Sequence, residues 1–424
     1  MVHHYDDEPL ARGQQKTSRI CIGQVRGDRE RRMAVTDAPA GPLEGIRVLD
    51  LTSVIMGPLA TQIFGDLGAD VITVEDPRGT LARVMTRGPL PGLSGLALNL
   101  LRNKRNVVYD LKDPAGRQAV LDIAATSDVV VTNLRPGTLR RLGLTYADFC
   151  DVRPDIVFCR AQGYPSDSPQ ADAPAYDDVI QAGGGLADVF ARQGSEPRLI
   201  PTLVADKVSG LTIAYAVLAA LVQRERTGQG QEIEVPMIDV VTSFTLVEHA
   251  GAATAEPPQG APGYARVLEP NRSPQQTADG WIMVLAYTRQ NFIDLFTEAG
   301  HPERADDPRI ATASSRLEHI DDLYAEVAAL VKERTTAEWL AFCAERGIPA
   351  SPVATLEEMV EALPIEVHPD AGPYRVIPQP VRFGASASVP TVRRPAAHSG
   401  QHNEEVAREV AGDAGASNRK DERP

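Results

Sequence analysis

The sequence predicts an α/β protein: a large Rossmann-like domain with a parallel sheet, followed by a smaller α+β domain. From residue 45 onward, apolar segments typical of buried strands alternate with segments of helical periodicity. The links between them are short, which favours a parallel sheet covered by helices on both faces. After about residue 250 this alternation gives way to a Pro/Gly-rich stretch, which indicates a second unit.

The first part of the chain reads as strand, helix, strand from its start. GIRVLDL predicts a buried strand, and the helix after it begins with Pro58 in its first turn. Thr227 and Gly228 stop a later apolar helix, and an alternating strand follows them. Strands are expected over residues 45–51, 69–77, 106–112, 127–134, 153–164 and 232–235, and helices over 58–67, 114–125 and 207–223.

The second part predicts a strand over residues 280–287, a helix over 289–299 and another over 317–350 that breaks near Thr335. We therefore expect a leader without fixed structure over 1–41, a large domain over 42–250 and a linker with a small domain over 251–350. Residues 351–411 are expected to return to the large domain, and 412–424 to form a disordered tail.

Composition narrows the classes of partner and compartment. The 424 residues carry a formal net charge of −14, which disfavours nucleic acid as a partner. The longest apolar run, residues 211–222, is too short to span a bilayer, and the first residues lack the apolar core of a signal peptide. The four cysteines are scattered without metal-ligand spacing. We expect no metal site, no membrane partner and a cytoplasmic protein.

Asp206 is the first candidate for a functional residue, because it lies where an extended stretch enters the apolar helix of residues 207–223. An aspartate at that place commonly caps the helix by accepting its free amides. The alternative is a reactive carboxylate, and the residues upstream favour it. They include Tyr176, Asp177 and the triple glycine 183–185 in the segment AYDDVIQAGGGL. The glycines permit either a close backbone approach to a ligand or a tight turn.

Together with GIRVLDLTSVIMGPLATQIFGDLGADVITVEDP, these segments resemble the class III CoA-transferases, a family that includes formyl-CoA transferase, carnitine CoA-transferases and α-methylacyl-CoA racemase. The resemblance runs from about Leu43 to Val410. It implies a large domain made from both ends of the chain and an interlocked homodimer. It also implies transfer of coenzyme A from an acyl-CoA donor to a carboxylic acid acceptor. Coenzyme A is then a substrate, and no cofactor is bound permanently.

The resemblance implies that Asp206 is a covalent nucleophile, which forms an aspartyl anhydride and then an aspartyl-CoA thioester. Tyr176 stands where racemases of the family carry a histidine. A phenol is a poor base but a good hydrogen-bond donor to a thioester oxygen, so transferase chemistry is favoured over racemase or epimerase chemistry. Simple packing is the other role open to Tyr176.

Positions that line the nucleotide pocket in the family match Lys104, Asn133, Leu134, Arg141 and Leu142. The alternative interpretation is that the basic residues of these segments form a solvated surface and bind no ligand. The chain departs from formyl-CoA transferase at Asp76, where that enzyme carries an arginine near coenzyme A. Arg78 or Arg83 would have to supply this charge. Such departures leave the donor acyl group and the acceptor acid open.

Two further functions compete with transfer. A dinucleotide-dependent oxidoreductase would place an acid such as Glu75 after the second strand, but the turn after the first strand has the single glycine Gly57. Without the G-x-G-x-x-G pattern, the backbone cannot approach a pyrophosphate closely. A non-catalytic coenzyme A-binding protein is the second alternative, since helix capping alone would also account for Asp206.

Overall fold

A computed structural model of the chain describes residues 41–383 and 391–418. The chain divides into two compact units, residues 1–37 and 38–424. The first unit lies outside the described residues, as does the predicted leader up to residue 40. The domain boundaries that we expect within residues 42–411 stay predictions.

A six-stranded sheet with only parallel pairs forms the core, in the order β3-β2-β1-β4-β5-β6. β4 pairs with β1 on the side opposite β2, so the strand order reverses there. This arrangement confirms the predicted α/β fold class, and it opens a crevice at the carboxyl ends of β1 and β4. The strands are β1 (Arg47–Leu51), β2 (Asp70–Glu75), β3 (Lys104–Val108), β4 (Val129–Thr132), β5 (Val157–Gln162) and β6 (Gln231–Pro236).

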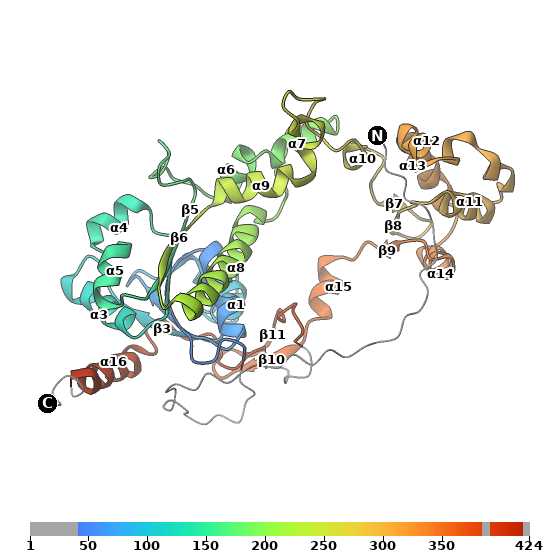
Figure 1. Cartoon of the computed structure of the whole chain (residues 1–424). Helices are drawn as coiled ribbons and strands as arrows, with labels where there is room; N and C mark the ends of the chain where they lie inside the picture. Colours follow the sequence, from blue (N-terminus) through green and yellow to red (C-terminus); the bar gives the residue numbers. More distant parts are fainter. Residues whose placement is uncertain (1–40, 384–390, 419–424) are drawn as a thin grey trace, which may run out of the picture. The chain divides into compact units, whose positions relative to one another are not determined.

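Side chains alternate along these strands, so the sheet buries two separate apolar layers. Val48 and Val129 pack with α1 and α8, whereas their neighbours Leu49 and Val130 pack with α3, α5 and α16. Figure 1 shows α1 and α8 on one side of the sheet and α3 and α5 on the other. The helices of these layers are α1 (Met56–Asp66), α3 (Pro114–Ala125), α4 (Pro136–Leu142), α5 (Tyr146–Val152), α8 (Val204–Thr227) and α16 (Asn403–Asn418).

α8 has 24 residues and is rich in apolar side chains. Within residues 41–383 and 391–418, it is the one helix that is long and apolar enough to cross a membrane. The apolar run 211–222, which we judged too short to span a bilayer, is only part of this helix. Packing accounts for one face of this helix, because Ala205, Ile213 and Val217 are fully buried against the sheet and α1, whereas Leu211, Tyr215 and Val222 are more than half exposed. α8 is therefore a core helix of the described fold.

Three consecutive glycines allow α6 (Asp177–Gly183) and α7 (Leu186–Arg192) to turn beside α9 (Met237–His249). A Cβ atom on Gly184 would lie 2.5 Å from the Val241 side chain of α9. Gly185 has a φ of 89°, which favours glycine. Of the two roles that the sequence left open, the structure displays the tight turn with close helix packing.

A buried ion pair supports the turn between β1 and α1. Lys104 Nζ lies 3.2 Å from Asp50 Oδ2 and donates to Thr61 Oγ1 at 2.7 Å. The Lys104 and Asp50 side chains are 1% and 0% exposed. Burial would raise the pKa of Asp50, but Lys104 and hydrogen bonds from Thr52 and Thr61 outweigh it and hold that pKa below its ordinary value.

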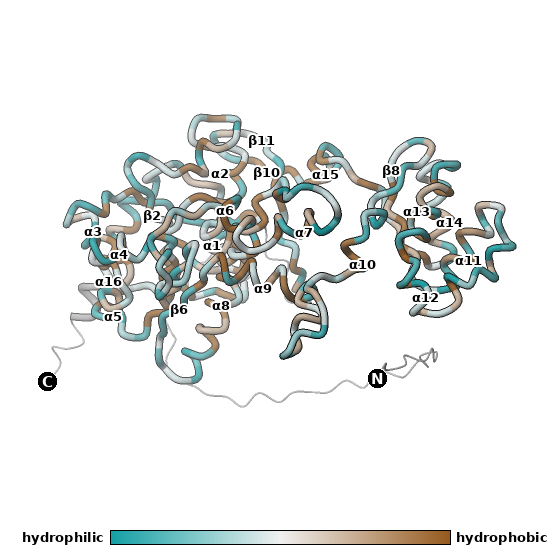
Figure 2. Tube along the Cα trace, turned by 90° about the horizontal axis from the view of Figure 1, so that it is seen from above, coloured by the Kyte–Doolittle hydropathy of each residue, from teal (hydrophilic) through white to brown (hydrophobic). Residues whose placement is uncertain are grey.

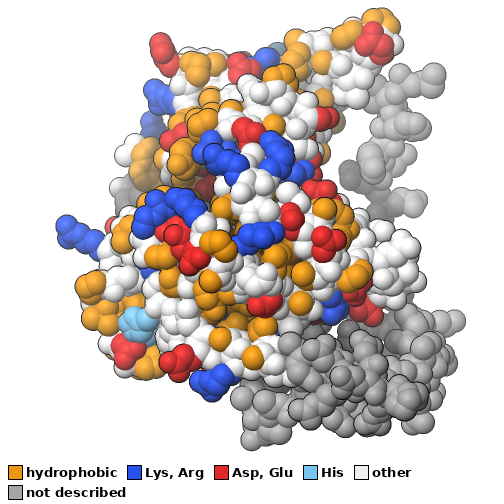
Figure 3. All heavy atoms as spheres, turned by 90° about the vertical axis from the view of Figure 1, so that its left-hand side faces the viewer, with side chains coloured by type: hydrophobic (Ala, Val, Ile, Leu, Met, Phe, Trp, Pro, Cys, Tyr) orange, Lys and Arg blue, Asp and Glu red, His pale blue; other side chains and the backbone are white. Residues whose placement is uncertain are grey.

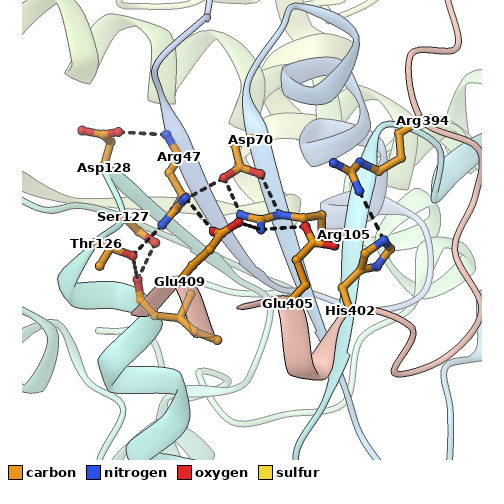
Figure 4. Close-up of polar contacts among 11 residues, drawn as sticks. Arg47, Asp70, Arg105, Thr126, Ser127, Asp128, Arg394, His402, Glu405 and Glu409 are labelled. Atoms are coloured by element: carbon orange, nitrogen blue, oxygen red, sulfur yellow. Dashed lines mark hydrogen bonds and ion pairs between the residues drawn. The ribbon is translucent and has the colours of Figure 1, made fainter. Parts of the chain in front are cut away.

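The C-terminal segment returns to the sheet through a network of charges (Figure 4). Asp70 accepts hydrogen bonds from Arg47 and Arg105, and both arginines also pair with Glu409 of α16. His402 Nδ1 accepts a hydrogen bond from the backbone N–H of β3 at residue 106. α16 continues to Asn418, beyond the position where we expected ordered structure to end, and residues 419–424 lie outside the described chain.

A separate apolar core, which includes Phe292 and Trp339, forms from residues after the Pro/Gly-rich stretch. Here β8 pairs antiparallel with β7 and β9. The helices mix hydrophobic and hydrophilic residues, as one-sided burial requires (Figure 2). Thr335 caps α14, so the helix break that we predicted near this residue is confirmed. The elements are β7 (Gln275–Gln276), β8 (Trp281–Val284), α11 (Arg289–Glu298), α12 (Ala313–Glu318), α13 (Ile320–Val331), α14 (Thr336–Arg346) and β9 (Ala350–Pro352).

An antiparallel hairpin, β10 with β11, follows this core. Tyr374 of β11 packs with Leu98 of α2, so the chain after the small core rejoins a segment near its beginning. The remaining elements are α2 (Gly95–Leu100), α10 (Ala265–Leu268), α15 (Leu356–Glu361), β10 (Ile365–His368) and β11 (Gly372–Arg375).

The buried pair makes Lys104 a structural residue, and this can be tested. Lys104→Met should lower the free energy of unfolding by about 3–5 kcal/mol, because it leaves Asp50 charged and buried without its partner. The exposed Lys332→Met, outside the cleft, is the matched control and should change stability by less than about 0.5 kcal/mol. Chemical denaturation measures both. Unchanged stability together with weaker coenzyme A binding would return Lys104 to the ligand site.

Candidate active site

Asp206 lies in the first turn of α8, two residues after its start. The N-cap position belongs to Leu203, so the capping role considered for Asp206 is not the one that the structure gives it. Its carboxylate has no hydrogen-bond partner among residues 41–383 and 391–418. A carboxylate in that state is available to a ligand.

The carboxylate of Asp177, and not that of Asp206, accepts a hydrogen bond from a backbone N–H at the start of α8. Its Oδ1 accepts a hydrogen bond from the backbone N–H of Asp206 at 2.9 Å, and its Oδ2 accepts one from Gln181 Nε2 at 2.6 Å. Gln181 Oε1 in turn accepts from the backbone N–H of Ile200 at 2.9 Å. Asp177 is 3% exposed and Gln181 is fully buried. The start of α6 is thereby fastened to the start of α8.

This arrangement brings two carboxylates together at one helix start, and it changes the acidity of Asp206. Burial and the neighbouring charge of Asp177 raise the pKa of Asp206 from 3.8 to about 6. Both causes disfavour the charged form of the side chain. Asp206 is consequently more basic than an ordinary aspartate, as a nucleophile in a partly dry site should be.

A cavity of about 250 Å³ opens beside Asp206. Tyr176 lines it from the residue before α6, and its side chain is 65% exposed. The structure therefore brings the two predicted catalytic residues together, across segments that are far apart in the chain. The other lining residues are Ser53, Val54, Met56, Asn133, Arg135, Gln162, Gly163, Ala173, Pro174, Ala175 and Met237.

A larger cleft of about 1140 Å³ adjoins this cavity, because Ser53 and Val54 line both. It follows the carboxyl ends of β1 and β2, where ligands of doubly wound sheets bind. Val54 has a φ of 71°, a strained conformation for a β-branched residue. Lys and Arg side chains gather across the face that Figure 3 shows. The charged lining of the cleft is mixed: its cations are Arg78, Lys112, Arg117, Arg140 and Arg141, and its acids are Glu75, Asp76, Asp110 and Asp113.

Four of the predicted binding residues line the large cleft: Arg78, Leu134, Arg141 and Leu142. Asn133 lines the small cavity instead, and its side chain exchanges two hydrogen bonds with the backbone of Ser53. It holds the loop that separates the two spaces.

The structure places Lys104 and Arg83 elsewhere. Lys104 is buried against Asp50, and Arg83 is 6% exposed with its Nε 2.8 Å from Glu75 Oε2. Neither side chain lines the cleft, so these placements do not support the binding roles expected for them. Arg78, the other substitute for the missing arginine, reaches the cleft but is paired with Asp76 through Nε at 2.7 Å.

Sequence reasoning missed Lys112 and Arg117 in the cleft and Gln162 in the cavity. Their positions in the chain could have indicated them, because Gln162 is the last residue of β5 and both Lys112 and Arg117 come after β3. Residues just after the carboxyl ends of parallel strands collect at one edge of the sheet. No group of three or more His, Cys, Asp or Glu residues that could hold a metal occurs in the described part of the chain.

Comparison with known proteins defines the class. Residues 43–403 match the family described as CoA-transferase family III, and the chain belongs to it. It is 34% identical over 389 residues to "Probable fatty acyl-CoA transferase Rv3272" of Mycobacterium tuberculosis, covering 87% of this chain and 98% of that one. It is 31% identical to "Succinyl-CoA:glutarate CoA-transferase" of Mus musculus, covering 87% and 86%.

A solved structure of a CAIB/BAIF family protein from Brucella suis has a similar fold. Its TM-score is 0.74 at 28% identity, and the match covers 88% of this chain and all of that one (100%). These findings confirm the predicted family and establish that the chain is an enzyme of the class III CoA-transferases, whose substrates are CoA thioesters.

The acidity of Asp206 can be measured by difference titration of the wild-type protein against Asp206→Asn. We expect a midpoint near pH 6, and a lower midpoint in an Asp177→Asn background, because the like charge is gone. The raised folded pKa means that ionisation of Asp206 costs stability, so Asp206→Asn should stabilise the fold above pH 6 and not below pH 3.8.

Asp178→Asn is the matched control for the Asp177 variant, since Asp178 is the exposed neighbour on α6. It should leave the midpoint unchanged. A wild-type midpoint at the ordinary value of 3.8 would contradict the electrostatic description of the site.

Proposed function

We propose that the protein is an acyl-CoA:carboxylate CoA-transferase that uses Asp206 as its covalent nucleophile. The observation that carries this proposal is a half-buried carboxylate of raised pKa, without a partner in the described residues, beside the junction of a large cleft and a small cavity. The cleft suits the phosphates and adenine of coenzyme A, and the cavity suits the acyl group. The thioester would then lie near the loop of Ser53 and Val54.

In the first half-reaction, a carboxylate oxygen of Asp206 attacks the thioester carbonyl carbon. The carbon–sulfur bond breaks, coenzyme A leaves as its thiolate, and a mixed anhydride remains on Asp206. The thiolate then attacks the aspartyl carbonyl carbon. The anhydride carbon–oxygen bond breaks, which releases the donor acid and leaves an aspartyl-CoA thioester.

In the second half-reaction, the acceptor carboxylate attacks this thioester and expels the thiolate again. The thiolate attacks the acceptor-derived carbonyl of the new anhydride, which forms the product acyl-CoA and restores the Asp206 carboxylate. Every step exchanges one leaving group for one nucleophile. Neither a metal nor a redox cofactor is required for the balance.

The geometry supports each requirement of this sequence of steps. The pKa of about 6 leaves Asp206 ionised at neutral pH but more nucleophilic than a solvated aspartate. Asp177 holds the backbone of Asp206 at the start of α8, beside the cavity. Tyr176 can donate a hydrogen bond to the oxygen that gains charge in the tetrahedral intermediates.

We also propose that the protein is a cytoplasmic homodimer. Apolar side chains of α8 and α9 that are about half exposed or more support a second copy as their partner. Isolated exposed residues of this kind are common, but a group of them on adjacent helices marks an interaction surface. The group comprises Leu211, Tyr215, Val222, Phe244, Leu246 and Val247.

The alternatives have weaker support. A racemase needs a second base facing Asp206, and the position before α6 holds Tyr176. An oxidoreductase needs an open glycine-rich turn after β1, whereas a Cβ atom on Gly57 would lie 2.3 Å from the Thr52 side chain. That glycine serves internal packing of the turn.

Asp206→Ala should reduce transfer between an acyl-CoA and a free acid by at least about a thousandfold, since the covalent route is removed. Affinity for free coenzyme A should stay within about threefold, because the cleft residues are untouched. Asp178→Ala is the control, with transfer near the wild-type rate. Calorimetric titration and a coupled transfer assay provide the two readouts. Transfer by Asp206→Ala at the wild-type rate would reject the nucleophile.

Arg141→Gln should raise the dissociation constant of coenzyme A by on the order of tenfold, because a charge-assisted hydrogen bond to a phosphate is lost from the cleft. Its affinity should also depend less steeply on ionic strength. Arg408→Gln, on the exposed side of α16, is the control and should bind as the wild type does. Equal affinity in both variants would exclude Arg141 from the coenzyme A site.

A further inference from the structure

Val54 has a backbone conformation that its residue type disfavours. Its φ is 71°, in the left-handed region, where the branched side chain of a valine crowds the backbone. Within residues 41–383 and 391–418, the one other non-glycine residue with a positive φ is Asn103. Asparagine adopts this conformation readily, and Asn103 Nδ2 also donates to Asp66 Oδ1 at 2.7 Å. Local chemistry therefore accounts for Asn103, whereas at Val54 a glycine would fit with less strain.

The surrounding structure holds the loop of Val54 in this conformation. The backbone N–H of Ser53 donates to Asn133 Oδ1 at 3.1 Å, and Asn133 Nδ2 donates to the backbone oxygen of Ser53 at 2.9 Å. The backbone N–H and the hydroxyl of Thr52 both donate to Oδ1 of the buried Asp50. Strained residues persist where their surroundings over-determine them, and such residues cluster at functional sites.

Val54 also lies at the boundary between the two ligand spaces. It is half-buried and lines both the large cleft and the small cavity, whereas Asp206 lines the cavity and not the cleft. Coenzyme A in the cleft must bring its sulfur to Asp206 in the proposed reaction, so the thioester passes beside Val54. The presence of valine where glycine would be less strained indicates a use for its side chain at this boundary.

We propose that Val54 is a positioning residue whose side chain closes the boundary between cleft and cavity to water while Asp206 carries a covalent intermediate. The inference rests on the proposed transferase function and adds to it a residue that favours transfer over hydrolysis. Without this barrier, water attacks the carbonyl carbon of the aspartyl-CoA thioester. The carbon–sulfur bond breaks, one proton of the water goes to the leaving thiolate and the other to solvent, and the Asp206 carboxylate is restored without a product acyl-CoA.

The test measures hydrolysis and transfer separately in Val54→Gly. Donor and acceptor are the pair that gives the fastest transfer, chosen from acetyl- to palmitoyl-CoA and from acetate to glutarate. Release of free thiol without an acceptor measures hydrolysis, and chromatography of the new acyl-CoA measures transfer. The ratio of hydrolysis to transfer should rise on the order of tenfold, because water reaches the intermediate. The urea midpoint of unfolding should equal or exceed that of the wild type, since the strain is relieved.

Val54→Ala separates the side chain from the backbone, because alanine keeps the disfavoured conformation and loses both methyl groups of the valine. It should raise the ratio as much as Val54→Gly does. Val353→Gly is the matched control, since Val353 is exposed, follows β9 and has no positive φ. It should keep the wild-type ratio and lower the urea midpoint, because glycine there only adds freedom to the unfolded chain.

An unchanged ratio in both Val54 variants would overturn the inference. A rise confined to Val54→Gly would also overturn it, because the effect would then belong to backbone mobility and not to the side chain. Equal losses of transfer and hydrolysis together with a lower midpoint would make Val54 a structural residue. Each of these results leaves the proposed function intact, whereas absence of Asp206-dependent transfer from every acyl-CoA would overturn the proposed function and this inference with it.

Discussion

The hydrogen bond from the Asp206 backbone to the Asp177 carboxylate is the constraint on which the site depends. A helix start offers amides to one carboxylate, and here a buried neighbour occupies that position. The side chain of Asp206 is thereby left free, and it also stands next to a like charge in a partly dry environment. One contact thus positions the proposed nucleophile, keeps it unpaired and raises its basicity.

The rest of the fold brings ligand spaces to this point. Reversal of the strand order at β1 and β4 opens the crevice, and the loop of Ser53 and Val54 divides it into a long cleft and a short cavity. α8 reaches this loop because Gly210 lets it pack closely on α1, where a Cβ atom would lie 2.8 Å from the Met56 carbonyl oxygen. The position of Asp206 therefore depends on internal packing as much as on its own helix.

Local patterns predicted the strands of the main sheet and the helices α1, α3 and α8, but they did not predict α4 to α7 or α9 or the partners of charged residues. Periodicity placed α3 correctly, and the helix stop at Thr227 and Gly228 matches the end of α8. Lys104 was expected to line the nucleotide pocket, yet it and its two basic neighbours each pair with a distant carboxylate: Arg102 with Asp66, Lys104 with Asp50 and Arg105 with Asp70. Such pairing depends on which strands become neighbours. Spacing in the sequence does not contain that information, and the same holds for the strained backbone of Val54.

Covalent transfer through Asp206 can be tested by intact-protein mass spectrometry after the protein is mixed with acyl-CoA. We expect a donor-dependent mass increase that hydroxylamine removes, with the modified peptide containing Asp206 and no increase in Asp206→Asn. An adduct on another residue, or transfer without any adduct when the reaction is quenched within a turnover, would contradict it.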